Sequence, residues 1–153
     1  MSAHDHTACM AATLAAAASL GAGLTPLRRR VLAIVLESHT PLGAYDVLAT
    51  LAKDGTRPAP PTVYRALDFL KAQGLVHRID SRNAFVACFA PGKAHRNHFL
   101  LCDKCGRAVE LADAPLDTAL QAAANARGFL VERETVEITG KCADCASLTP
   151  LKP

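Results

Sequence analysis

Four of the six cysteines fall into two pairs with the same short spacing, Cys102-x-x-Cys105 and Cys142-x-x-Cys145. Each pair can direct two thiolates towards neighbouring corners of a tetrahedron, so the two pairs together can enclose one Zn²⁺ ion. Four thiolates leave no open position for a water molecule, which favours a structural zinc site over a catalytic one. The alternative is four unrelated buried cysteines, for which the repeated spacing would be a coincidence.

A second group of side chains also carries donor atoms that zinc accepts. Its members are His77, Cys88, His95, His98 and Glu110. If the turn-like residues 82 and 83 centre a β-hairpin, His77 and Cys88 lie directly opposite each other, with Cβ atoms about 5 Å apart. That distance suits two ligands of one ion, but a strand histidine or a buried cysteine is also commonly structural, so spacing leaves a second metal site open.

The choice between His95 and His98 is open as well. On a helical turn the two rings could face the same ion, whereas in an extended chain they point to opposite sides. His4, His6 and Cys9 could also bind metal, but so close to the terminus we expect them to be incidental.

Helices come first among the elements that must position these side chains. Residues 11–20 are Ala-rich and helix-prone, and a second helix is expected to begin at Thr25-Pro26 and end before Pro41. A third helix is expected over 44–53, and residues 59–70 are expected to start a fourth helix. Two short apolar runs follow, 75–80 and 84–89, and read as a β-hairpin. Three of these helices and the hairpin make a winged helix-turn-helix.

A second lobe is expected beyond the break at Pro91-Gly92. Strands are predicted at 99–102 and 108–111, a helix at 116–127, and a further β-rich stretch at 129–139. The predicted fold class is α+β: an N-terminal winged helix-turn-helix followed by a small α/β domain.

Composition and charge narrow the function classes. The formal charge of +3 lies in the first half, because residues 1–85 hold nine Lys/Arg against six Asp/Glu and residues 86–153 hold eight against eight. This permits a nucleic-acid partner without requiring one. The uncharged run 11–24 is too short to span a bilayer, and residues 1–10 carry no Lys or Arg to start a secretory signal. We expect a cytoplasmic protein with no membrane partner, whose reduced cysteines bind metal.

The chain resembles the ferric uptake regulator family, and within it the zinc uptake regulator branch. The resemblance covers roughly residues 24–146 and rests on several matching segments. They are Leu24-Thr25-Pro26 with Arg28, residues 44–46, residues 61–70, residues 74–78, residues 102–110 and the final cysteine pair.

The resemblance implies a homodimer with two zinc ions per subunit. It implies a winged-helix DNA-binding domain over 1–90, a hinge over 91–98 and an α/β dimerisation domain with a four-cysteine zinc site over 99–153. The structural zinc would be held by Cys102, Cys105, Cys142 and Cys145. A regulatory zinc would be held by His77, Cys88, His95 and Glu110.

The same resemblance implies a zinc-responsive repressor that binds palindromic operators of zinc-uptake genes. Tyr45 and Arg65 would contact bases, since an outward arginine on a recognition helix can reach guanine O6 and N7. Tyr64 and Arg28 would contact phosphates.

Three other functions compete with this interpretation. A regulator of the same family could sense iron, manganese or peroxide, although Cys88 in the ligand set is more typical of zinc sensing. A zinc hydrolase or deaminase needs an open metal position and a general base, and neither a His-x-Glu nor a His-Glu-x-x-His motif is present. A zinc-ribbon module that binds only proteins would leave the helix-turn-helix and Arg65 unexplained. We therefore expect a regulator and not an enzyme.

Overall fold

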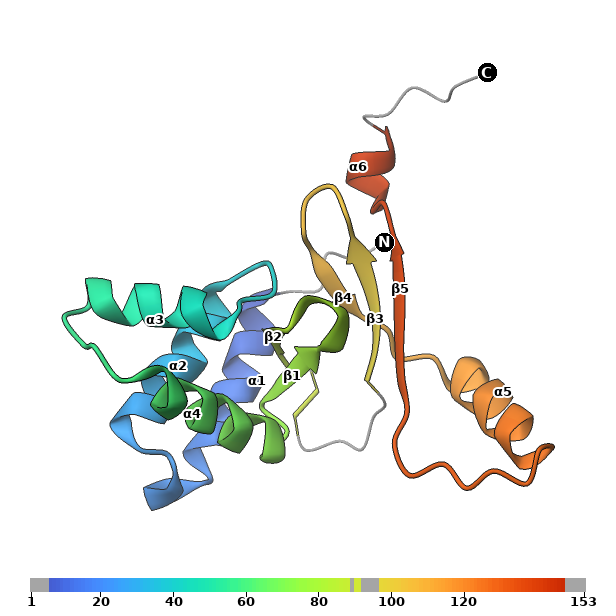
Figure 1. The fold of residues 1–153 in the computed structure, drawn as a ribbon, viewed down its shortest axis with the longest axis horizontal. Helices are drawn as coiled ribbons and strands as arrows, with labels where there is room; N and C mark the ends of the chain where they lie inside the picture. Colours follow the sequence, from blue (N-terminus) through green and yellow to red (C-terminus); the bar gives the residue numbers. More distant parts are fainter. Residues whose placement is uncertain (1–5, 89, 92–96, 148–153) are drawn as a thin grey trace. The chain divides into compact units, whose positions relative to one another are not determined.

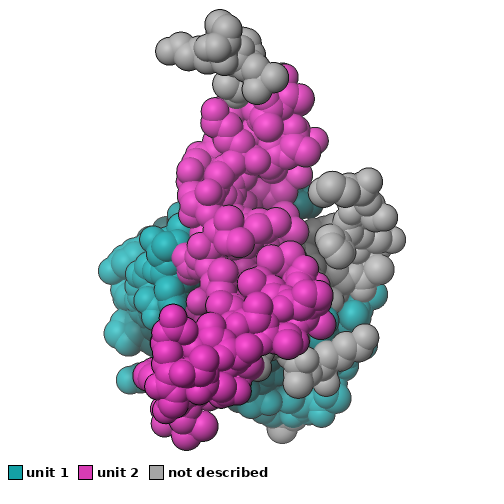
Figure 2. All heavy atoms as spheres, turned by 90° about the vertical axis from the view of Figure 1, so that its right-hand side faces the viewer, with its two compact units in different colours: residues 1–93 teal, residues 94–153 magenta. Residues whose placement is uncertain are grey.

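In this computed structural model the chain forms two compact units, residues 1–93 and 94–153, which Figure 2 shows in two colours. The structure describes residues 6–88, 90–91 and 97–147. The division between the units falls within the segment 91–98, whose role as a hinge stays a prediction. The predicted α+β fold class is confirmed.

The first unit contains the four predicted helices (Figure 1). They are α1 (His6–Ala18), α2 (Pro26–Glu37), α3 (Ala44–Lys53) and α4 (Pro60–Ala72), with a 3₁₀ turn η1 (Gly21–Gly23). The hydroxyl of Thr25 caps α2 by accepting the Arg28 N–H at 3.4 Å, and Pro26 takes the first helical position as expected. Gly74 follows the end of α4 with φ of +71°, a conformation that glycine adopts without steric cost.

One hydrophobic core joins α2, α3 and α4. Each helix contributes side chains that are at most 2% exposed: Val31, Leu32, Val35, Val47, Leu51, Val63, Leu67 and Leu70. Burial of one such side chain stabilises the fold by about 1.5–3 kcal/mol, so this apolar stripe fixes the rotation of α4 about its axis. As a result, Arg65 and Asp68 on the opposite side of α4 are exposed.

The hairpin consists of β1 (Val76–Ile79) and β2 (Ala84–Ala87), and its register differs from the predicted one. His77 pairs with Val86, so the expectation that His77 lies directly opposite Cys88 was wrong. The reason is the connection: residues 80–82 form a 3₁₀ turn η2 (Asp80–Arg82) and Asn83 takes a left-handed φ of +45°. The turn therefore occupies residues 80–83, and its centre lies between 81 and 82, one residue before the predicted centre. The partner of His77 accordingly moves by two positions along the second strand, to Val86.

The described part of the second unit, residues 97–147, is a three-stranded sheet with two helices (Figure 1). The strand order is β4 (Ala108–Glu110), β3 (Asn97–Cys102), β5 (Thr135–Gly140), with β3 antiparallel to β4 and parallel to β5. The crossover between the parallel strands carries α5 (Ala114–Asn125), and α6 (Ala143–Ser147) follows β5. The predicted β-rich stretch at 129–139 is strand only from Thr135 onwards, and α6 was not predicted.

Among the residues that the structure describes, no helix is both long enough and apolar enough to cross a membrane.

Candidate metal centres and DNA-contact residues

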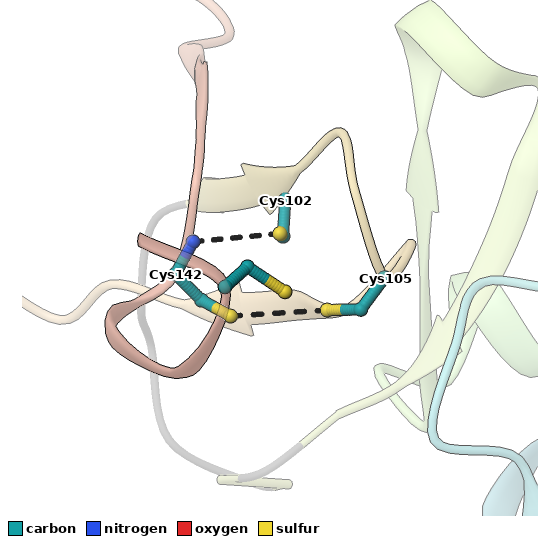
Figure 3. A group of neighbouring side chains, drawn as sticks. Cys102, Cys105 and Cys142 are labelled. Atoms are coloured by element: carbon teal, nitrogen blue, oxygen red, sulfur yellow. Dashed lines mark hydrogen bonds between the residues drawn. The ribbon is translucent and has the colours of Figure 1, made fainter. Parts of the chain in front are cut away.

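The parallel pairing of β3 and β5 brings the two cysteine pairs together. Cys102 ends β3 opposite Gly140 at the end of β5. The turn after β3 therefore places Cys105 near Cys142, which follows β5, and near Cys145, which lies in α6. The four Sγ atoms lie within 4.8 Å of one another. Figure 3 shows Cys102, Cys105 and Cys142 converging, with 3.8 Å between the Sγ atoms of Cys105 and Cys142. A tetrahedron with Zn–S bonds of about 2.3 Å has S···S edges of about 3.8 Å, so the geometry fits one zinc ion.

The electrostatics of this cluster also favour a cation. Hydrogen bonds from main-chain N–H groups, first from Cys142, lower the pKa of Cys102 to about 6. Hydrogen bonding with the Cys142 thiol, followed by burial, raises the pKa of Cys145 to about 12. With a pKa of about 12, Cys145 stays protonated near neutral pH unless a cation lies among the sulfurs. Zinc would supply that charge.

An exposed ion pair lies beside the four-cysteine cluster. Arg107, after the first cysteine pair, lies 3.1 Å from the Asp144 carboxylate, which belongs to α6 between Cys142 and Cys145. Both side chains are exposed, so this contact contributes little by itself. It joins the same two segments that the cysteines join.

His77 and Cys88 lie side by side within the first unit. In the observed register Cys88 is a diagonal neighbour of His77 on the same face of the hairpin, and a ring nitrogen of His77 lies within 4.8 Å of the Cys88 Sγ atom. His77 is 7% exposed and Cys88 is fully buried. A soft thiolate beside an imidazole is a donor set that suits zinc.

The other two predicted ligands of this second site belong to the second unit. Glu110 ends β4, where it pairs with Phe99 and is half-buried. His95 lies outside the described residues.

His98 belongs to a different cluster. Its ring is fully buried, and its Nε2 atom lies 2.9 Å from Asp117 of α5 and 3.1 Å from Glu134 before β5. Sequence analysis singled out His98 but missed both carboxylates, because neither shares a spacing pattern with it. One imidazole nitrogen and two carboxylate oxygens can hold a divalent cation or pair as an imidazolium with its counter-ions.

The predicted base-contacting residues are both accessible. Tyr45, at the start of α3, is 69% exposed although tyrosine is usually half-buried, and Arg65 is exposed on α4. The two predicted phosphate contacts are less accessible. The Arg28 guanidinium lies 3.7 Å from the centre of the Phe69 ring and donates to the Gly23 carbonyl at 2.7 Å, and Tyr64 packs partly against the core.

The family model described as "Ferric uptake regulator family" matches residues 19–139. The zinc uptake regulation protein of Escherichia coli (strain K12) is 35% identical over 126 residues, which cover 82% of this chain and 74% of that protein. A peroxide-responsive repressor of Staphylococcus saprophyticus is more distant, at 29% identity over 82% of this chain and 83% of that protein.

Two solved structures have the same fold. A zinc uptake regulator in complex with zinc and DNA has a TM-score of 0.79 and 31% identity, covering 97% of this chain and 98% of that chain. The holo form of a regulator named XcZur has a TM-score of 0.73 and 47% identity, covering 81% and 86%. The resemblance inferred from sequence is confirmed, and the chain belongs to the ferric uptake regulator family.

Proposed function

We propose that this protein is a zinc-responsive transcriptional repressor, which binds as a homodimer to palindromic operators of zinc-uptake genes when zinc fills a regulatory site. The observation that carries the proposal is the buried pair of His77 and Cys88, since a thiolate ligand selects zinc over iron and manganese. The zinc-uptake names of the similar proteins and the zinc and DNA in one of the similar structures support it. The protein is a regulator and not an enzyme, and it acts in the cytoplasm.

Each subunit holds two zinc ions in this proposal. One is structural and is bound by the four clustered cysteines, Cys102, Cys105, Cys142 and Cys145. The other is regulatory and is bound by His77, Cys88, His95 and Glu110. The engagement of the His98 ring by Asp117 and Glu134 supports His95 as the remaining histidine ligand.

The regulatory ligands come from both units, and this provides the coupling to DNA. Without the ion the units sample several relative orientations, and His77 and Cys88 can share a zinc ion with His95 and Glu110 in only one of them. In that orientation the two α4 helices of the dimer would lie about 34 Å apart, one turn of B-DNA. RNA polymerase is excluded from an operator bound in this way.

The DNA-contact residues follow from the exposed faces of α3 and α4. Arg65 donates to guanine O6 and N7 in the major groove, and Tyr45 contacts a neighbouring base. Tyr64 and Arg28 contact phosphates. Arg28 is half-buried, so the side chain is still partly accessible.

Fluorescence anisotropy with a palindrome from upstream of a zinc-transporter gene tests the proposal. Buffered free zinc is titrated first, then iron and manganese. We expect tight binding only as zinc rises. If iron or manganese promotes binding and zinc does not, the protein senses another metal, and the absence of binding with every metal would contradict a repressor of that operator.

The substitution Cys88→Ser identifies the regulatory site. It should abolish zinc-dependent DNA binding while the dimer stays folded with its structural zinc, because only one ligand of the second site is lost. Cys9→Ser is the matched control, since Cys9 is the one cysteine in neither proposed site. Unchanged zinc-dependent binding by the Cys88→Ser protein would reject this site.

A further inference from the structure

Among the side chains of α1 that the structure describes, from Met10 onwards, one is polar and buried. Thr13 is fully buried in a helix composed mainly of alanine. Threonine forms helices less well than alanine because its branched side chain restricts its rotamers. Its position in the interior therefore calls for a specific contact.

The hydroxyl of Thr13 contacts the main chain of a distant residue. A helical threonine commonly donates to the carbonyl one turn earlier, and Thr118 of α5 does so, to Ala114 at 2.9 Å. The Thr13 hydroxyl instead donates to the carbonyl of Cys88 at 2.9 Å, across 75 residues of sequence. It joins α1 to the end of the hairpin.

Cys88 is held on both sides by this arrangement. Its N–H donates to the Leu75 carbonyl at 2.9 Å, which continues the pairing of β1 with β2, and its C=O accepts from Thr13. The residue follows the last strand residue, Ala87, so the hydroxyl of Thr13 fixes the peptide where the strand ends. Main-chain atoms fixed on both sides of the Cys88 Cα set the direction of its Cα–Cβ bond, and so limit the positions that Sγ can reach by rotation about χ1.

We propose that Thr13 is a positioning residue of the regulatory zinc site, whose hydroxyl holds the Cys88 peptide so that Sγ and the His77 ring can share one ion. This inference rests on the proposed function, in which Cys88 is a zinc ligand. Helix α1 ends before residue 19, where the match to the family model begins, so the contact adds an element of this chain to the metal sensor. Partners that orient a metal ligand commonly change metal affinity by about 10- to 100-fold when they are lost.

Three substitutions at Thr13 test the role in the full-length dimer with its structural zinc retained. Thr13→Val keeps the shape and removes the hydroxyl, Thr13→Ala removes it with a good helix former, and Thr13→Ser keeps it. Thr118→Val is the matched control, since it removes a helical hydroxyl that bonds within its own helix.

Two measurements separate positioning from general stability. The first is the zinc affinity of the second site, by competition with a chromophoric chelator well below the melting temperature. The second is the thiolate-to-metal charge-transfer band when Co²⁺ occupies that site. Thr13→Val and Thr13→Ala should bind zinc about 10-fold more weakly and shift the band, whereas Thr13→Ser and Thr118→Val should match the unsubstituted protein.

The outcomes distinguish this inference from the proposed function. Wild-type zinc affinity and an unchanged band in both Thr13→Val and Thr13→Ala would overturn the positioning role, even if their melting temperatures fall. If Cys88→Ser loses the second zinc in the same assay, the regulatory site stands and only the role of Thr13 fails. If Cys88→Ser keeps that zinc, the regulatory site itself is wrong.

Discussion

His98 is a fully buried ionisable residue of the second unit, and the chemistry around it differs from that around Cys88. Its ring faces two oxygen donors, Asp117 and Glu134, whose side chains are 32% and 12% exposed. The proposed regulatory site includes a thiolate, which prefers softer metals than carboxylates do. We therefore assign His98 to the stability of the second unit, and the proposed zinc count stays at two per subunit.

Replacing His98 with leucine tests whether this residue binds a metal ion or only stabilises the second unit. The variant should still bind two zinc ions per subunit, and its free energy of unfolding should fall by about 1–3 kcal/mol because the partly buried Asp117 carboxylate loses its hydrogen-bond partner. Zinc content by mass spectrometry and urea unfolding provide the two readouts. His39→Leu is the control, since His39 is exposed. Three zinc ions in the unsubstituted protein and two in His98→Leu would show that the His98 cluster is a metal site.

A functional residue can be recognised from sequence only if it lies at a fixed, short spacing from its partners. The cysteine pairs carry their own spacing, so their grouping was predicted, and the structure brings all four together. Asp117, Glu134 and Thr13 meet their partners only through the tertiary fold, and no spacing relates them to those partners. For that reason none of the three was predicted.

At the scale of elements, the hairpin shows where local reasoning fails. The strands were predicted from their apolar residues, and both are present. The register depends on the turn, which takes four residues here because residues 80–82 form a 3₁₀ turn and Asn83 adopts a left-handed conformation. Two-residue hairpin loops are the commonest, but loops of three to five residues also occur often, so the apolar pattern alone does not fix the length of the turn. His77 and Cys88 still meet, as diagonal neighbours in place of direct partners.

Helix α4 presents Arg65 because its opposite face is buried, and this leads to a prediction about DNA. Arg65→Ala should weaken binding to the specific operator by about 1–3 kcal/mol while leaving zinc binding and unfolding unchanged, because the side chain is exposed. Anisotropy with the operator and with a scrambled duplex of the same length measures the specific part. Arg127→Ala, an equal loss of charge on an exposed residue of the second unit, should bind as the unsubstituted protein does. Equal losses in both variants would indicate a general charge effect and no base contact by Arg65.

At the scale of the whole molecule, sequence predicts the class of each unit better than the details of the second. Helical and strand periodicity identified the winged helix, since its core is built from regular apolar stripes. In the second unit the strand at the end of the sheet begins six residues later than the predicted stretch, at Thr135 in place of 129. Residues 129–134 contain β-forming side chains, but β5 begins only where it pairs with β3, from the Asn97–Thr135 pair onwards. The start of β5 is therefore set by its pairing with the distant strand β3 and not by the β-propensity of the local side chains.

The structural zinc ties the two ends of the second unit, so its loss should affect the whole dimer. Cys105→Ser is the informative variant because Cys105 is exposed, and the substitution itself removes little packing. We expect the zinc content to fall from two ions per subunit to one. The free energy of unfolding should fall by several kcal/mol, since a structural zinc contributes about 10–16 kcal/mol to zinc-finger peptides.

With the second unit loosened, the dimer should dissociate and operator binding should be lost, although α4 and the hairpin of the first unit remain folded. Sedimentation velocity, zinc content and circular dichroism measured on one preparation test this chain of effects. A Cys105→Ser protein that keeps both zinc ions and remains a dimer would mean that the four-cysteine cluster does not hold the structural metal.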